Sequence, residues 1–213
     1  MPSRFSGRIL AHLSHSAYRP SQPNIIERQM RIETDDHDVF ESSIESLVEL
    51  NSIAIGEDGR IRLATFGDEV IGRLRMNHRG FGFVRTETPT RDGDLFVPRG
   101  DTKDAIGGDL VRCSVIRRSE KRGRGADFKA KRGVKGVIVE VLERGKSTFA
   151  GKLIQRGHNI LVEPDGRQLK EPILIRDADV KGAKVGQKVL FELLLYPDAN
   201  GIGEGVITEV LGE

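Results

Sequence analysis

The chain has 213 residues, of which 37% are hydrophobic and 31% charged, and its formal net charge is +2. Its one cysteine, Cys113, excludes an internal disulfide and is typical of a reducing compartment. No stretch approaches the roughly 20 apolar residues that a membrane helix needs. These features favour a cytoplasmic protein with no membrane partner, folded as one domain or as two or three small ones.

Charge is distributed unevenly along the chain. Residues 1–66 contain 7 basic and 10 acidic residues, residues 67–150 contain 19 and 12, and residues 151–213 contain 8 and 10. The middle segment, with its excess of positive charge, is therefore the part that has an electrostatic reason to meet a polyanion.

Residues 1–66 show the patterns of three short helices and a hairpin. Apolar residues at helical spacing predict a first helix from Arg8, Pro23 suits the first turn of a second, and the acidic residues from Asp35 suit the start of a third. Asp58-Gly59 between two alternating runs predicts the hairpin. We expect a small winged-helix-like domain. Such domains often bind nucleic acid, but this one is acidic, so a packing or interaction role stays open as well.

The remaining chain repeats itself. The recurring segments are Gly72–Leu74 as Gly151–Leu153, Phe83-Val84 as Leu161-Val162, Gly108–Val111 as Gly186–Val189, and Gly136–Leu142 as Gly205–Leu211. The last pair matches at six of seven positions. Two copies at so long a period indicate tandem domains rather than a solenoid.

Each copy shows about five short strands separated by turns rich in glycine and aspartate. We place them near 69–77, 80–87, 93–98, 109–117 and 134–143, and near 148–155, 159–163, 171–176, 187–195 and 202–211. Five antiparallel strands in so small a unit are typical of a barrel of the oligonucleotide-binding (OB) type. The expected fold is mainly β, with a winged-helix-like α+β domain over 1–66 and two tandem five-stranded OB barrels over 67–145 and 146–213.

Two phenylalanines stand two residues apart within Arg79–Val84. On a strand, Phe81 and Phe83 share one face, and Phe96 can join them from a neighbouring strand. The ordinary fate of such residues is a core. However, the alternate positions are glycines, which weaken a strand and often mark the close approach of a ligand or of another backbone. We interpret the three rings as a platform that stacks unpaired bases.

The insertion in the first copy is strongly basic. Residues 117–135 hold nine basic and two acidic residues, and glycines make a flexible loop there. A solvated hairpin tip would also explain such a run, but its position in the copy with the phenylalanines favours contact with phosphates. The second copy has Gly157–Val162 in place of the aromatic stretch and keeps no aromatic pair. We expect it to guide RNA or to pack against another domain.

These residues resemble a known family. Arg79–Val84 resembles the first ribonucleoprotein motif of cold-shock domains, and Asp94–Pro98 resembles the second. Met76 stands where cold-shock proteins usually have an aromatic residue, and Pro98 where they usually have histidine. The same departures, the order of the domains and the Gly205–Gly212 ending resemble the N-terminal region of the ribonuclease R group, in the RNase II/RNB exoribonuclease family.

The resemblance implies a division of labour. In that family, an RNB domain with magnesium-binding aspartates cleaves RNA from its 3′ end, and it follows the second barrel, with an S1 domain after it. Neither domain is expected in this sequence. We therefore expect no catalytic residue, no metal site and no cofactor here, with Mg²⁺ only in a catalytic domain that lies elsewhere. The expected partners are single-stranded RNA and such an RNB domain.

The first copy supplies the candidate RNA-binding residues. They are Phe81, Phe83, Phe96, His78, Arg73, Arg75, Arg79, Arg117, Arg118, Lys121, Arg122, Arg124, Lys129, Lys131 and Arg132. The leading hypothesis is a protein that captures single-stranded RNA for a ribonuclease R-like 3′–5′ exoribonuclease. The alternatives are a free-standing cold-shock-type RNA chaperone or regulator, and a protein-interaction adaptor in which the phenylalanines are buried.

Overall fold

The computed structural model describes residues 4–117, 133–166, 168–169, 171–176, 182–197 and 202–212. Internal contacts divide the chain into two units. The first unit contains Met1–Gly67 and Thr86–Asp94, and the second contains Asp68–Arg85 and Leu95–Glu213. Within the described part, no helix is long and apolar enough to cross a membrane.

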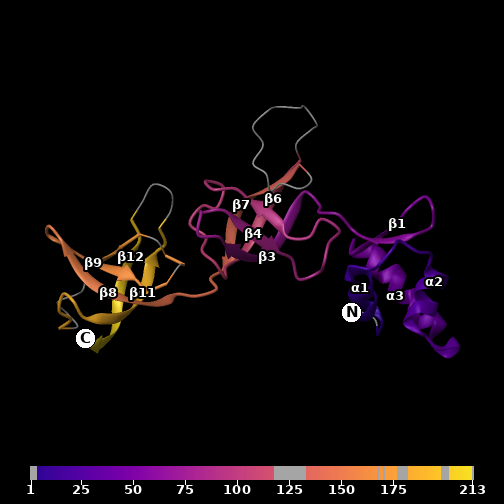
Figure 1. The fold of residues 1–213 in the computed structure, drawn as a ribbon, viewed down its shortest axis with the longest axis horizontal. Helices are drawn as coiled ribbons and strands as arrows, with labels where there is room; N and C mark the ends of the chain where they lie inside the picture. Colours follow the sequence, from indigo (N-terminus) through magenta and orange to yellow (C-terminus); the bar gives the residue numbers. More distant parts are fainter. Residues whose placement is uncertain are drawn as a thin grey trace. The chain divides into compact units, whose positions relative to one another are not determined.

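The first unit contains the three predicted helices and the predicted hairpin (Figure 1). Its elements are α1 (Ser6–Ser14), α2 (Pro23–Met30), the 3₁₀ turn η1 (Thr34–Asp36), α3 (His37–Glu49), β1 (Ile53–Ile55) and β2 (Ile61–Leu63). Ser21, between the first two helices, forms an isolated antiparallel bridge to Ile61. The hairpin thus gains a third, short backbone partner from the segment between α1 and α2.

The first unit has an apolar core to which its helices contribute. Phe5 is 2% exposed and packs edge-on against Phe40 of α3, with ring centroids 6.4 Å apart. Helix α1 begins at Ser6, two residues earlier than predicted, and the Phe5 carbonyl accepts its first backbone hydrogen bond, from the Ile9 N–H at 2.9 Å. Ile9 of α1 and Ile26 of α2 belong to the same core.

A histidine links α2 to α3. The His37 Nδ1 lies 2.7 Å from the Glu27 carboxylate, and the His37 Nε2 lies 3.5 Å from Glu41. The hydrogen bond to Glu27, and then its negative charge, raise the pKa of His37 above its ordinary value of 6.5. A pKa that is higher in the folded chain stabilises the fold fully below pH 6.5 and loses that contribution as the pH rises through the raised value.

An NMR titration of the imidazole signals tests this link. We expect His37 to titrate above pH 6.5, and Glu27→Gln to move its pKa back toward that value. The thermal midpoint of the first unit should fall as the pH rises through the His37 pKa. A His37 pKa at or below 6.5 would contradict the bridge, and His15, which lies outside it, serves as the internal control.

Among its described residues, the second unit contains ten strands in two groups (Figure 1). The first group is β3 (Glu69–Met76), β4 (Gly82–Arg85), β5 (Leu95–Val97), β6 (Leu110–Arg117) and β7 (Val134–Glu143). The second is β8 (Thr148–Arg156), β9 (Asn159–Pro164), β10 (Ile173–Ile175), β11 (Lys188–Leu195) and β12 (Glu204–Gly212). All ten predicted strands are present, and their ends agree with the prediction to within two residues.

The second group of strands closes into a barrel by strand pairing, whereas the first group does not. In the second, β10 pairs in parallel with β12 and completes a closed barrel in the order β10-β12-β11-β8-β9. The first is a five-stranded sheet in the order β5-β4-β3-β6-β7, so the closed barrel expected for this copy is not completed by strand pairing among the described residues. Its β5 ends at Val97, and the Ile138 N–H of β7 instead donates to the Asp101 carbonyl beyond the strand, at 2.9 Å. Side chains pack across the remaining gap, because Gly136 lies directly against Leu95.

The repeated glycines have a shared geometric cause. A Cβ on Gly72 would lie 2.3 Å from the Arg85 carbonyl oxygen, and a Cβ on Gly151 would lie 2.5 Å from the Glu163 carbonyl oxygen. In both copies the neighbouring strand therefore crosses too closely for any side chain. The motif that opens each copy begins with glycine for this reason.

A buried carboxylate organises the end of the first copy. Asp109 is fully buried and accepts hydrogen bonds from the backbone N–H groups of Ile106 (3.0 Å) and Gly145 (2.9 Å) and from the Arg144 guanidinium (2.9 Å). Arg144 also binds the Asp104 carboxylate. These bonds fix the β5–β6 loop against the residues that follow β7.

Replacing this carboxylate should destabilise the second unit. Asp109→Ala removes the acceptor of the buried Ile106 N–H, of the Gly145 N–H and of the Arg144 guanidinium, and we expect a loss of about 2–3 kcal/mol in the free energy of unfolding. The matched control is Asp68→Ala, because Asp68 pairs with Arg117 at 3.0 Å but its side chain is 97% exposed. That change should cost under about 0.5 kcal/mol. Equal losses in denaturant titrations of the two variants would contradict the assignment.

Candidate nucleic-acid interface

Three phenylalanines, on or directly before two adjacent strands, form one cluster on the first sheet. Phe83 of β4 lies directly opposite Phe96 of β5, with ring centroids 5.6 Å apart. Phe81, just before β4, lies 5.8 Å from Phe83 and 5.7 Å from Phe96. The sequence prediction that these rings meet is confirmed.

Their burial distinguishes this cluster from a core. All three rings are half-buried, whereas the neighbouring Val84, Leu95 and Val97 are at most 1% exposed. The interior of this sheet is thus filled by aliphatic side chains. In the second copy, by contrast, Phe149 and Phe191 are buried within the core. The three rings therefore present partly open surface on the outside of the sheet.

The glycines beside the phenylalanines serve the fold. Gly82 is buried, and a Cβ there would lie 2.7 Å from the Leu74 side chain and 3.1 Å from the Met76 sulfur. Gly80 has a φ of +88° in the turn between β3 and β4. The close approach that these glycines indicate is thus internal to the domain, and it leaves the outer face of β4 to the rings.

The cations around the cluster differ in whether they already have a partner. In the described part of the chain, the side chains of Arg75, His78 and Arg79 have no hydrogen bond or ion pair. Arg75 lies directly opposite Phe83 across the β3–β4 pair. Arg73, two residues away on the same face, donates to Glu143 and to the Gly108 carbonyl, both at 3.2 Å.

Arg99 is a further cation that the sequence reasoning missed. It follows Pro98 at the end of the second motif, and its side chain lies 3.4 Å from the position that a Cβ on Gly80 would take. Among the described residues it has no hydrogen-bond or ion-pair partner. Its position directly after the Asp94–Pro98 motif is the sequence feature that could have identified it as a candidate.

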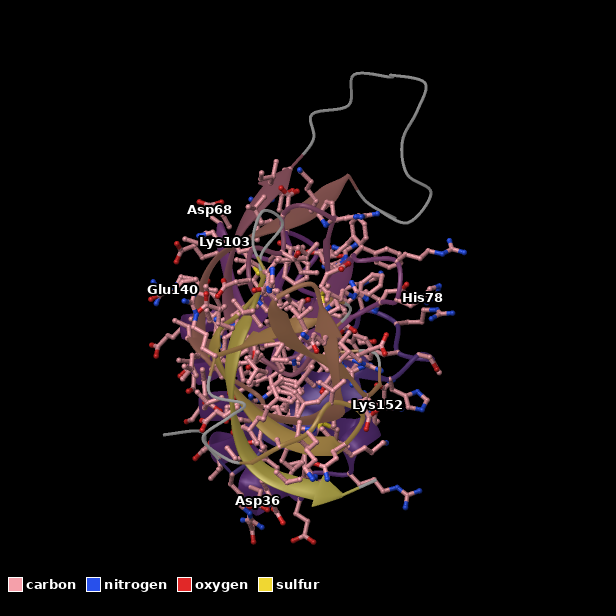
Figure 2. All side chains as sticks on the ribbon, turned by 90° about the vertical axis from the view of Figure 1, so that its left-hand side faces the viewer. Asp36, Asp68, His78, Lys103, Glu140 and Lys152 are labelled. Carbon is pink, nitrogen blue, oxygen red and sulfur yellow. The ribbon has the colours of Figure 1, made fainter. Side chains whose placement is uncertain are left out.

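On the other strands of this sheet, cations are paired with carboxylates. Arg112 lies 3.7 Å from Glu140, Arg117 lies 3.0 Å from Asp68, and Lys135 lies 3.0 Å from Asp101. Figure 2 shows His78 on the opposite side of the view from Asp68, Lys103 and Glu140. Arg75, which has no partner in the described part of the chain, shares its face of the β3–β4 pair with Phe83.

Several predicted site residues cannot be placed. Arg118, Lys121, Arg122, Arg124, Lys129, Lys131 and Arg132 lie outside the described residues. Outside 117–135, residues 67–150 contain ten basic and ten acidic residues. The pairing state of each cation, rather than net charge, therefore decides which of the described residues can meet a phosphate.

The second copy carries a different set of side chains at the corresponding positions. Leu153 pairs with Val162 as Leu74 pairs with Val84, which aligns the two strand pairs. By this register Asn159, Leu161 and Leu174 stand where the first copy has Phe81, Phe83 and Phe96. The same strand arrangement thus forms with and without the three rings.

A metal site is not evident in the part of the chain that the structure describes. No group of three or more His, Cys, Asp or Glu residues there is arranged to hold a metal ion. The expectation that magnesium belongs to another domain stays a prediction.

Both copies match known domain families. Residues 72–128 match the ribonuclease B OB domain, and residues 161–213 match the cold shock domain. Ribonuclease R of Acidithiobacillus ferrooxidans is 22% identical over 207 residues, which are 96% of this chain and 44% of the relative. Ribonuclease R of Escherichia coli is 32% identical over 146 residues, which are 68% of this chain and 16% of the relative. The chain thus spans less than half the length of these curated relatives.

Solved structures show the same fold. Yeast Ssd1, described as a pseudonuclease, matches 81% of this chain with a TM-score of 0.53 and 20% identity, over 24% of its own length. Mycoplasma genitalium RNase R, solved with ribose-methylated single-stranded RNA, matches 68% of this chain with a TM-score of 0.50 and 17% identity, over 22% of its own length. By its domain matches and its curated relatives, the chain is related to the N-terminal region of ribonuclease R, with the OB and cold-shock domains of the RNB family.

Proposed function

We propose that the chain binds single-stranded RNA on the face of its first OB domain. The observation that carries this proposal is the triangle of half-buried rings, Phe81, Phe83 and Phe96, bordered by Arg75 and Arg99 without partners. Unpaired bases stack on such rings whatever their sequence, and the arginines are free to meet the phosphates between them. The M. genitalium relative, solved with single-stranded RNA, supports RNA as the ligand.

The biological role that we propose is RNA capture for a 3′–5′ exoribonuclease of the ribonuclease R type. The relatives that match this chain are longer proteins named ribonuclease R, and residues 72–128 of this chain match the ribonuclease B OB domain. Cleavage, with its magnesium, belongs in this proposal to an RNB domain outside the residues described above. A cytoplasmic location is part of the same proposal. The basic residues between 117 and 135 would add phosphate contacts in this proposal.

The first unit has a different role in this proposal. Its helices and hairpin, with the bridge from Ser21, suit a winged-helix domain, in which α3 would be the helix that reads nucleic acid. Yet the exposed side chains of α3 include Asp38, Glu41 and Glu45, and the helix contains no lysine or arginine. Because such a face repels phosphates, we assign this unit to protein contact rather than to RNA.

The second copy supplies a test of the platform that should not disturb folding. The triple change Phe81→Asn, Phe83→Leu and Phe96→Leu installs the side chains that the second copy has in the same register. We expect the variant to fold and its Kd for single-stranded RNA, measured by fluorescence anisotropy, to rise at least about tenfold, because each stacked base contributes about 1–3 kcal/mol.

The triple change alters no charge, which provides the internal control. The slope of log K against log salt should therefore stay as in the unchanged protein. Unchanged affinity in a variant with a normal melting curve would rule out stacking and favour the adaptor hypothesis, in which the rings face another protein.

Two arginines on one strand test the role of the unpaired cations. Arg75→Gln should weaken RNA binding and lower the magnitude of the salt slope by about 0.7, the value for one phosphate contact on a single strand. Arg73→Gln is the matched control: it lies on the same face of β3, but its guanidinium is already held by Glu143. Equal effects of the two changes in salt titrations would contradict the sorting of cations by their partners.

A further inference from the structure

A pocket opens beside the aromatic platform, where the two copies of the second unit meet. Its volume is about 290 Å³, and its lining includes Met76 and Gly80 from the end of β3 and its turn, Thr102 from the β5–β6 loop, and Gln168 and Leu169 from the second copy. Gly80 directly precedes Phe81, so the pocket begins where the platform ends. The volume is near the lower end of the range for ligand sites, which suits a ligand the size of a single nucleoside.

Three contacts hold the walls of this pocket together. Ile106 is 5% exposed and lies in the hydrophobic core of the second copy, beside Phe149 and Leu153. The Gln168 side-chain amide donates to the Gly107 carbonyl at 3.1 Å. The Arg144 guanidinium, held by the buried Asp109, lies over the Tyr196 ring at 3.5 Å. The pocket is therefore formed before any ligand binds.

The lining combines an apolar floor with polar edges. Met76, Ile106 and Leu169 supply apolar surface. Met76 belongs to the inner side of β3 with Leu74, so it lines this pocket and does not extend the outer platform. A flat aromatic base needs such a floor, together with hydrogen-bonding groups at its edge.

The side-chain amides of Asn77 and Gln168 each keep a hydrogen-bonding group that can meet a ligand. The Asn77 Oδ1 accepts from the Arg79 backbone N–H at 2.9 Å, which leaves its NH₂ group available as a donor. Gln168 uses its NH₂ group on Gly107, which leaves its Oε1 as an acceptor. Arg99, also at the pocket, has no partner among the described residues and can meet the adjoining phosphate.

We propose that this pocket receives one nucleobase of the RNA strand, turned out of the stack at the end of the platform. The proposal rests on the RNA-binding function proposed above and deepens it, because it adds a position at which the base itself is recognised. Stacking on the platform tolerates any base, whereas Asn77 and Gln168 can hydrogen-bond to the edge of a base. The strand would then pass from the first copy toward the second.

Abasic scanning of the RNA tests the pocket. The probe is a single-stranded oligoribonucleotide of about 10 nucleotides, with one base removed at each position in turn, titrated against the full chain. We expect base removal at one position to weaken binding in the unchanged protein and to have no further effect in Gln168→Leu. Gln168→Leu itself should raise the Kd of the intact strand about three- to tenfold, the value of one net hydrogen bond.

The chain offers a close match as a control. Gln155 also donates its side-chain amide to a glycine carbonyl, that of Gly157, at 3.1 Å, but it lies outside the pocket. Gln155→Leu should leave the Kd and the abasic profile unchanged. A second variant, Thr102→Phe, fills the pocket without removing either amide, and it should abolish the same single-position effect while its melting curve confirms folding.

The outcomes separate this inference from the function on which it rests. If the unchanged chain does not bind the strand, the proposed function fails. If the chain binds, and the triple change in the platform weakens it, but Gln168→Leu and Thr102→Phe both leave the abasic profile intact, then the pocket inference alone is wrong.

Discussion

The tight packing of Gly82 against Leu74 fixes the geometry on which the candidate site depends. A Cβ at this position would lie 2.7 Å from the Leu74 side chain, so β4 can turn only glycine toward the interior here, with the buried Val84 two residues on. Successive residues of a strand face opposite sides, and Phe83 is therefore directed outward between them. A slip of one residue would reverse every side chain of β4 and place the rings inside. The outward position of the phenylalanines is thus a consequence of how Gly82 and Val84 pack in the interior.

The internal repeat separates what folding requires from what the surface adds. Both copies keep glycine at Gly72 and Gly151, where a neighbouring carbonyl leaves no space, and both keep the pair of inner residues that sets the strand register. They differ in the outward residues, which are aromatic in the first copy and aliphatic or polar in the second. Since the second copy closes its barrel without those rings, their presence in the first cannot be ascribed to folding.

Local sequence patterns predicted the helices and strands well. Features that depend on contacts between distant elements could not be predicted from them. The strands could be read from alternation and from glycine-rich turns, because those signals depend on the nearest neighbours in sequence. The shared face of Phe81 and Phe83 followed from the strand period, and Phe96 joined them on the expectation that its strand is a neighbour. The difference between Arg73 and Arg75 could not be predicted, because it depends on Glu143, which is 70 residues away. Met76 alternates with Arg75 along β3 and therefore lies on the inner side of the strand with Leu74. The pocket is formed by segments of both copies, and no single segment carries a signal for it.

The junction between the copies gives the second one a role even though it has no aromatic platform. Ile106, from a loop of the first copy, is buried in the core of the second, and Asp109 fixes the chain that connects them through Arg144 and Gly145. A mobile linker would leave the second copy to bind RNA by its own weak contacts, at an effective concentration set by the linker. A fixed junction instead lets it supply Gln168 and Leu169 as a preformed wall next to the rings. Preorganisation of this kind removes the ordering cost from binding, so a domain with few contacts of its own can still contribute to affinity and to the choice of base.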